Sequence, residues 1–157
     1  MRLTHLADYA VVLMTAAARR DAGERLSATE LSADTGVPLP TAQKLMGQLT
    51  ASGLLTSARG ASGGFALSRP ADSISLADIV EAVEGPIALT MCSESNNHEC
   101  ALDQHCRVKP HMGVVGNAVR GALSAVSLEH LSSPAQAGVQ PGQERVWAPA
   151  FAGGRSK

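Results

Sequence analysis

The chain has 157 residues, enough for one domain with appendages, and its hydrophobic residues (45%) include few aromatics (3%). A core built from Ala, Leu, Val and Ile is expected, which suits helices. No apolar run approaches the roughly 18 residues of a membrane span, and no positively charged leader precedes an apolar stretch. We therefore expect a cytoplasmic protein with no membrane partner.

The net charge of −1 conceals an uneven distribution along the chain. Residues 1–70 carry 7 Lys and Arg against 5 Asp and Glu, residues 71–106 carry none against 7, and residues 107–157 carry 6 against 2. Phosphate binding depends on local positive charge rather than on the total. A nucleic-acid surface is therefore expected within the first 70 residues.

The first third of the chain predicts three helices. Residues 6–20 repeat apolar side chains at helical spacing after Thr4, a residue type that caps helices. Ser27 and Glu30 form a capping box before a short helix, residues 28–35, which Gly36 ends. In residues 39–52, one face carries Ala42, Leu45, Met46 and Leu49, and the other carries Pro40, Thr41, Lys44 and Gln48. Two short helices around a Gly-containing turn predict a helix-turn-helix.

A β-hairpin is predicted directly after these helices. Residues 54–57 and 65–68 are short enough to be strands, and the loop ARGASGG between them holds three glycines and Arg59. A hairpin with a cationic tip is typical of a wing, where Arg59 enters a minor groove while the preceding helix reads the major groove. The expected fold is mainly α with a small β-hairpin wing: a winged helix-turn-helix.

Two further helices are predicted. Ser75 and Asp78 cap one that runs to Glu84 and is stopped by Gly85. A last helix over residues 110–131 has an apolar stripe with no partner inside such a small domain, so we interpret it as a dimerisation helix. Its stripe consists of Val115, Val119, Ala122, Val126 and Leu128.

These patterns divide the chain into four parts. We expect a DNA-binding domain over residues 1–85, a cysteine-containing loop over 86–107 and the dimerisation helix over 108–131. The remaining residues, 132–157, are rich in Pro, Gly, Ala and Gln without periodicity, which predicts a disordered tail.

All three cysteines of the chain, Cys92, Cys100 and Cys106, fall in the predicted loop. In a reducing compartment, an odd number of clustered thiols argues for metal ligation or redox sensing rather than a structural disulfide. The spacing alone does not decide between an iron-sulfur cluster and a zinc site completed by a histidine, and a metal-free thiol switch ranks third. The candidate histidines are His98, His105 and His111.

Other candidates are weaker when taken alone. Asp8, in the first turn of a helix, is explained by the helix dipole. Lys44 on the predicted reading helix and Arg59 at the wing tip favour DNA contact over ordinary surface charge. The chain has no Cys-x-x-Cys pair and no nucleotide-binding glycine motif, which argues against a redox enzyme or a small-molecule substrate.

Taken together, these segments resemble one family. The resemblance is carried by MRLTHLADYAVVLM, by PLPTAQKLMGQLTASGLLTSARGASGGFALSRP, and by ISLADIVEAVEGPIALTMC with the cysteine triplet. They look like the Rrf-type winged-helix regulators, the family of IscR and NsrR, and most like the branch that regulates SUF-type iron-sulfur assembly operons. The resemblance spans roughly residues 1–131.

The resemblance implies a homodimeric DNA-binding transcription factor with one iron-sulfur cluster, 2Fe-2S or 4Fe-4S, per subunit. The three cysteines would be cluster ligands. The third helix would read the major groove and Arg59 would serve the wing. By position, the residues of that helix are Thr41, Gln43 and Lys44, and Gln48 lies on the same predicted outer face.

The fourth ligand departs from one pattern of the family and matches another. In IscR a histidine three residues after the last cysteine ligates the cluster, and here that position is Lys109. In the NsrR pattern an aspartate from the partner's first helix completes the site, and Asp8 occupies that position. We therefore favour Asp8 over His111 or His105.

The function expected from the resemblance is repression of iron-sulfur assembly genes when clusters are plentiful. Iron supply, redox state or nitric oxide would provide the signal. The alternative is a zinc-stabilised winged-helix DNA-binding protein whose metal is purely structural.

Overall fold

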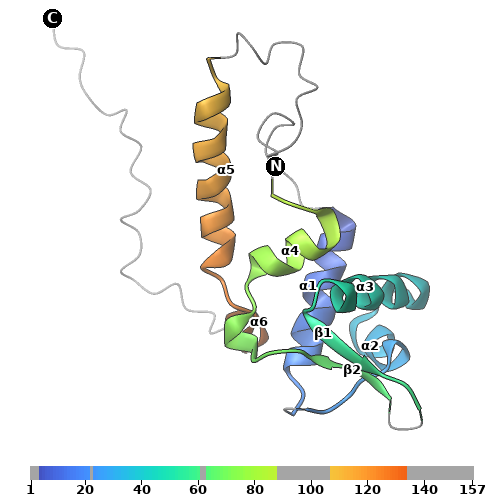
Figure 1. Ribbon diagram of the computed structural model, residues 1–157. Coiled ribbons are helices and arrows are strands. Elements are labelled where there is room, and N and C mark those ends of the chain that lie inside the picture. Colours follow the sequence, from blue (N-terminus) through green and yellow to red (C-terminus); the bar gives the residue numbers. More distant parts are fainter. Residues whose placement is uncertain (1–3, 22, 61–62, 88–106, 134–157) are drawn as a thin grey trace, which may run out of the picture.

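The computed structural model describes residues 4–21, 23–60, 63–87 and 107–133, and Figure 1 shows how their helices and strands are arranged. The elements in chain order are α1 (His5–Ala18), α2 (Ala28–Thr35), α3 (Leu39–Ala51), β1 (Leu55–Ala58), β2 (Gly64–Leu67), the 3-10 turn η1 (Ala71–Ser73), α4 (Leu76–Glu84), α5 (Lys109–Ser124) and α6 (Leu128–Ser132). The fold is mainly helical with one two-stranded hairpin, as the sequence predicts. None of the described helices has the length and apolar character that a membrane span needs.

The predicted start of α1 and both predicted ends of α2 are confirmed. Thr4 Oγ1 accepts a hydrogen bond from Ala7 N at 3.3 Å, which caps α1. Ser27 and Glu30 form the capping box of α2, and Gly36 ends that helix at φ 76°. Each such cap stabilises its helix by about 1 kcal/mol, because it satisfies backbone groups that have no partner within the helix.

The wing is an antiparallel hairpin in which Leu55 pairs with Leu67 and Ala58 with Gly64. A third, one-residue strand joins it: Leu26 N donates to Phe65 O at 2.9 Å, and Phe65 N donates to Leu26 O at 2.8 Å. The segment before α2 is thereby fixed to the wing. The sequence did not predict this bridge, because one residue has no periodicity.

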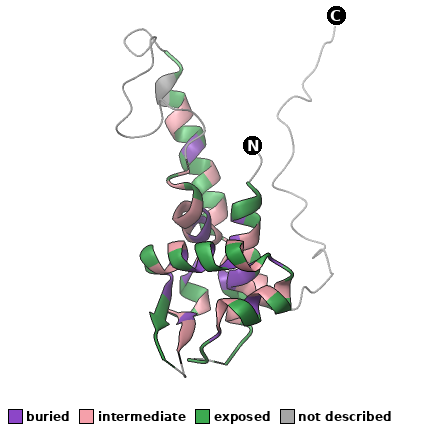
Figure 2. Ribbon diagram, turned by 90° about the vertical axis from the view of Figure 1, so that its right-hand side faces the viewer, coloured by how far each residue is buried: buried purple, intermediate pink, exposed green. Residues whose placement is uncertain are grey.

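The core is apolar and lies where α1, α2, α3, α4 and α6 meet beside the hairpin (Figure 2). We call these elements together the winged-helix body. No polar or charged residue among the described ones is buried. The two methionines Met14 and Met46 fill it beside the aliphatic residues that were expected. The largest fully buried side chains are Leu13, Met14, Leu31, Leu45, Met46, Leu49, Ile74, Ile79 and Leu128.

The prediction of one continuous helix over residues 110–131 is wrong. The chain leaves α5 after Ser124, and α6 starts from its own cap, Ser127. The break is fixed by backbone pairing with the segment before α4: Leu76 N donates to Val126 O at 2.8 Å, and Leu128 N donates to Ile74 O at 2.7 Å. Leu128 therefore belongs to the core and not to an unpartnered stripe.

α5 differs from the other long helices in its surroundings. It stands beside the winged-helix body and packs mainly on α4 (Figure 1). Among its residues whose burial is described, only Gly116 is buried. The face of α5 that turns away from α4 is open.

Candidate nucleic-acid interface and cysteine segment

The exposed stripe of α3 is rotated relative to the one that the sequence predicts. Gln43 and Lys44 are exposed as expected, whereas Thr41 and Gln48 are half-buried. Gln48 Oε1 is buried and has no hydrogen-bond partner among the described residues. The stripe is made up of Pro40, Gln43, Lys44, Gly47 and Ala51.

Gly47 and Ala51 are the residues of this stripe that the sequence did not single out, and Gly47 is the informative one. It is exposed in the helix, and a Cβ built there would meet no atom within 4 Å. The signal was available, since a glycine inside a helix costs about 1 kcal/mol relative to alanine. Such a residue lets another molecule approach the helix backbone closely.

The wing presents two arginines. Arg59 is exposed directly after β1, where it was predicted. Arg25, which the sequence did not indicate, lies beside the hairpin because its neighbour Leu26 pairs with Phe65, and its Nη1 donates to Gly64 O at 3.3 Å. The site therefore has one more guanidinium than expected.

The hairpin tip is possible only with glycine. A Cβ at Gly63 would lie 2.5 Å from Ala58 O, and Gly64 has φ 144° with Leu26 O 3.0 Å from a built Cβ. These two residues allow the wing to turn back tightly and to approach Leu26. Gly63 and Gly64 thus have a structural role in the wing.

Six arginines and lysines of the described part of the chain fall into two groups; Arg19, whose Nε donates to Ser132 O, and Arg107 belong to neither. Arg20, Arg69 and Arg120 form ion pairs with Asp34, Asp78 and Glu81, respectively. No described carboxylate forms an ion pair with the second group, Arg25, Lys44 and Arg59, which lies on α3 and around the wing. This second group gives the reading side a local positive charge that the pI near 6.5 does not reveal.

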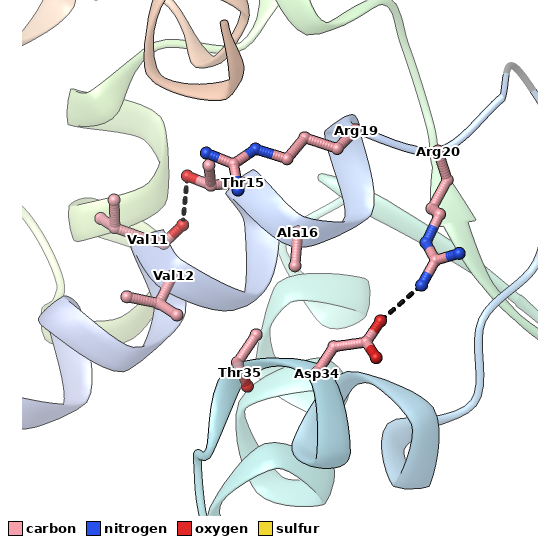
Figure 3. A pocket seen from close by; sticks show the side chains of 8 residues that line it. All are labelled: Val11, Val12, Thr15, Ala16, Arg19, Arg20, Asp34 and Thr35. Atoms are coloured by element: carbon pink, nitrogen blue, oxygen red, sulfur yellow. Dashed lines mark hydrogen bonds and ion pairs between the residues drawn. The ribbon is translucent and has the colours of Figure 1, made fainter. Parts of the chain in front are cut away.

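A groove of about 640 Å³ lies between α1 and α2 (Figure 3). Val11, Val12 and Ala16 contribute its apolar surface, and the ion pair of Arg20 with Asp34 spans it. Thr15 Oγ1 donates to Val11 O at 2.7 Å, so this hydroxyl satisfies a helix carbonyl. The groove brings together no acid, base and nucleophile as an enzyme site would.

The predicted metal ligands are divided between described and undescribed parts of the chain. Cys92, Cys100 and Cys106, together with His98 and His105, lie outside the described residues. Asp8 is exposed in the first turn of α1, and His111 is exposed in the first turn of α5. Within the described ranges, no three His, Cys, Asp or Glu side chains come together as a metal site.

Comparison with known families decides the class of protein. Residues 3–134 match the family model Rrf2, iron-dependent transcriptional regulator. The chain belongs to the Rrf2 family. As an Rrf2-family protein it is a transcriptional regulator with a DNA-binding winged helix, and not an enzyme.

Two curated relatives agree with the Rrf2 assignment. Protein aau3 of Rhizobium meliloti (strain 1021) is 35% identical over 133 residues, covering 83% of this chain and 84% of that protein. The HTH-type transcriptional regulator IscR of Photorhabdus laumondii is 29% identical over 131 residues, covering 83% and 79%.

Solved structures share the Rrf2 fold. CymR (YrzC), the global cysteine regulator of B. subtilis, has a TM-score of 0.64 at 24% identity, over 85% of this chain and 97% of that chain. T. potens IscR has a TM-score of 0.62 at 22% identity, over 83% and 85%. At these identities the likeness concerns the fold alone.

Proposed function

We propose that this Rrf2-family regulator binds its operator in response to an iron-sulfur cluster and represses iron-sulfur assembly genes of the SUF type. The observation that carries the proposal is the place of the cysteine segment in the chain. We define this segment as residues 88–106; it follows α4, which ends at Glu84, and precedes α5, which starts at Lys109. A ligand held by this segment acts on the connection between the winged-helix body and α5.

The donor set fits a cluster. The only three thiols of the chain fall within one segment, and thiolates are the ligands of iron-sulfur clusters. Cys92, Cys100 and Cys106 would hold the cluster, which supplies iron that is sensitive to oxidants and nitric oxide. Either a 2Fe-2S or a 4Fe-4S centre is compatible with three cysteines and a fourth ligand. The IscR relative supports this assignment.

Asp8 is the fourth ligand that we propose, contributed by the partner subunit. Its side chain is exposed, and no described side chain forms an ion pair with it. It is therefore accessible to a second chain. His111 is also exposed and remains the alternative on α5, with His105 in the cysteine segment.

The proposed reading surface is α3 with the wing. Gln43 and Lys44 would contact base edges or phosphates in the major groove, with Thr41 and Gln48 at the margin of the stripe, and Arg59 would enter the adjacent minor groove. The exposed positive charge of these elements supports the arrangement.

A homodimer is part of the proposal. The large exposed apolar side chains among the described residues lie on α1 and at α5: Leu6, Val12, Val108, Val114 and Val115, which are 37%, 43%, 56%, 69% and 45% exposed. An apolar surface of this kind is normally covered by another molecule. Two copies related by a two-fold axis would cover it and place two α3 helices on one DNA.

The proposal is tested by the metal content of the protein. Protein purified without oxygen should be coloured, with iron and acid-labile sulfide in equal amounts, and its three thiols should resist alkylation until the iron is chelated. A colourless protein with one tightly held zinc in native mass spectrometry would instead support the zinc-stabilised DNA-binding protein. Cys106→Ser should lose the colour while keeping the circular dichroism of the folded chain.

A further inference from the structure

Three carboxylates of α4 each bind a different part of the molecule. Asp78 Oδ2 lies 3.2 Å from Nη2 of Arg69, just beyond β2. Glu84 Oε1 accepts from Thr4 N at 3.0 Å and from Thr4 Oγ1 at 2.8 Å, at the start of α1. Glu81 lies between them in the sequence and binds α5. This spacing of three residues places them along one side of the helix, which we call the α4 carboxylate row.

Glu81 is the carboxylate of this row that binds α5. Its Oε1 and Oε2 accept from Nε and Nη2 of Arg120 at 2.8 and 2.9 Å, a two-bond geometry that fixes direction as well as distance. The same Oε1 lies 3.5 Å from the backbone N of Ile87, which donates to it. The Arg120 hydrogen bonds hold the pKa of Glu81 below its usual value, so the side chain stays ionised.

The two partners of Glu81 belong to the parts of the molecule that the proposed function must connect. Ile87 is the last described residue before the cysteine segment. Arg120 is on α5, and its pair with Glu81 is the one ion pair that joins α5 to the winged-helix body in the described ranges. One carboxylate therefore contacts both the entrance to the cysteine segment and the helix that is proposed to form the dimer.

We infer that Glu81 is a positioning residue that couples the cysteine segment to the position of α5, and through α5 to the spacing of the two reading helices. The inference rests on the proposed function. When the segment is held by its ligand, Ile87 N is held against Glu81 Oε1, and the carboxylate is oriented for Arg120. When the ligand leaves, Glu81 loses this contact, and α5 is less firmly held on α4. A ligand acts on DNA binding only through such a difference between two states.

Swapping the charges of Glu81 and Arg120 distinguishes the ion pair between these two residues from the hydrogen bond that Ile87 N donates to Glu81. In the double variant Glu81→Arg with Arg120→Glu, an ion pair between α4 and α5 is restored, but an arginine has no acceptor for Ile87 N. The quantity to measure is the ratio of the operator Kd without the cluster to the Kd with it, using DNA selected from a random pool by the wild-type holo protein.

We expect both single variants to unfold at lower temperature than the wild type and the double variant to regain most of the difference. The Kd ratio of the wild type should lie within the roughly 5–150-fold range that is usual for coupled sites. The Kd ratio of the double variant should fall to within about twofold of one, even though its stability is restored. Glu84→Gln is the matched control, because the carboxylate that it removes belongs to the same row but forms its hydrogen bonds with Thr4 and not with Ile87 or α5; its ratio should equal that of the wild type.

Linkage gives a second readout that a purely structural role would not change. Operator DNA should raise the concentration of iron chelator that removes half of the cluster at equilibrium from the wild type, because coupling between two binding equilibria is reciprocal, and should not raise it for the double variant. A double variant that keeps the wild-type ratio and the wild-type protection by DNA overturns the role of Glu81 but leaves the proposed function intact. A wild type without a cluster, or with a ratio of one, overturns both.

Discussion

Gly47 lies at the centre of the exposed stripe of α3, where a side chain would point away from the body of the protein. We predict that Gly47→Ala stabilises the apo protein by about 0.5–1 kcal/mol, because alanine restricts the unfolded chain and meets no atom in the folded one. The same methyl group should weaken operator binding severalfold, since it holds the DNA away from α3. Chemical denaturation and a binding titration measure the two effects.

Gly113→Ala supplies the control for this substitution. Gly113 is a helical glycine of α5, a built Cβ there also meets nothing within 4 Å, and its position on the helix is off the face that carries Val114 and Val115. It should give the gain in stability without the loss of affinity. Unchanged operator affinity in Gly47→Ala would show that the DNA does not approach the centre of α3.

Asp8 and His111 can be compared as fourth ligands in the same spectra. We predict that Asp8→Ala changes the absorption spectrum of the cluster and shortens its lifetime in air, whereas His111→Ala does neither. Both side chains are exposed, so neither substitution should lower the stability of the fold by more than about 0.5 kcal/mol. A spectrum and lifetime that are unchanged in Asp8→Ala would exclude this residue as a ligand.

At the scale of the elements, interactions between residues that are close in the sequence were predictable, and interactions between residues far apart in the sequence were not. The capping boxes of α2 and α4 connect residues three apart, so Ser27 with Glu30 and Ser75 with Asp78 are visible in the sequence. The end of α5 depends on pairing of Val126 with a segment about fifty residues earlier, and no local pattern reveals it.

The candidate site shows the same division. Lys44 and Arg59 were predictable, because the helix period and the hairpin loop place them on the surface. The half-buried position of Gln48 was not, because the rotation of α3 depends on how its apolar face packs in the core. Arg25 was missed for a related reason: it reaches the wing through the pairing of its neighbour with Phe65.

The ion pair between Glu81 of α4 and Arg120 of α5 should make the free energy of unfolding depend on pH. The hydrogen bonds from Arg120 lower the pKa of Glu81 from 4.5, its value in the unfolded chain. Because the pKa of Glu81 is lower in the folded protein than in the unfolded chain, the ionised carboxylate stabilises the fold. This stabilisation is fully present above pH 4.5 and is lost as the pH falls through the folded pKa.

We predict that Glu81→Gln is less stable than the wild type at pH 7, by less than about 1 kcal/mol because the pair is partly exposed. The difference should shrink as the pH falls from 4.5 through the lower folded pKa, since Glu81 is protonated first in the unfolded chain and then in the folded protein. Urea denaturation of the two apo proteins between pH 3 and 7 measures it. A difference that stays constant over this range would show that the charge of Glu81 does not contribute.

At the scale of the whole molecule, the open face of α5 is the feature that a monomer does not explain. Val114 and Val115 are 69% and 45% exposed and do not support the core of the monomer. We predict that the double substitution Val114→Glu with Val115→Glu converts a dimer to a monomer in analytical ultracentrifugation without changing the circular dichroism. Ala33→Glu, at an exposed position of α2, is the control and should leave the dimer intact. A doubly substituted protein that remains dimeric would place the interface elsewhere.

The proposed function requires that a ligand of the cysteine segment changes how tightly α3 and the wing bind DNA. An anaerobic titration of one operator fragment with holo protein, with the same sample after iron is removed, and again after the cluster is rebuilt, tests this coupling most directly. We predict that removal weakens binding about tenfold or more and that rebuilding restores it, a coupling of at least about 1.4 kcal/mol. Equal affinities in the three samples would contradict it.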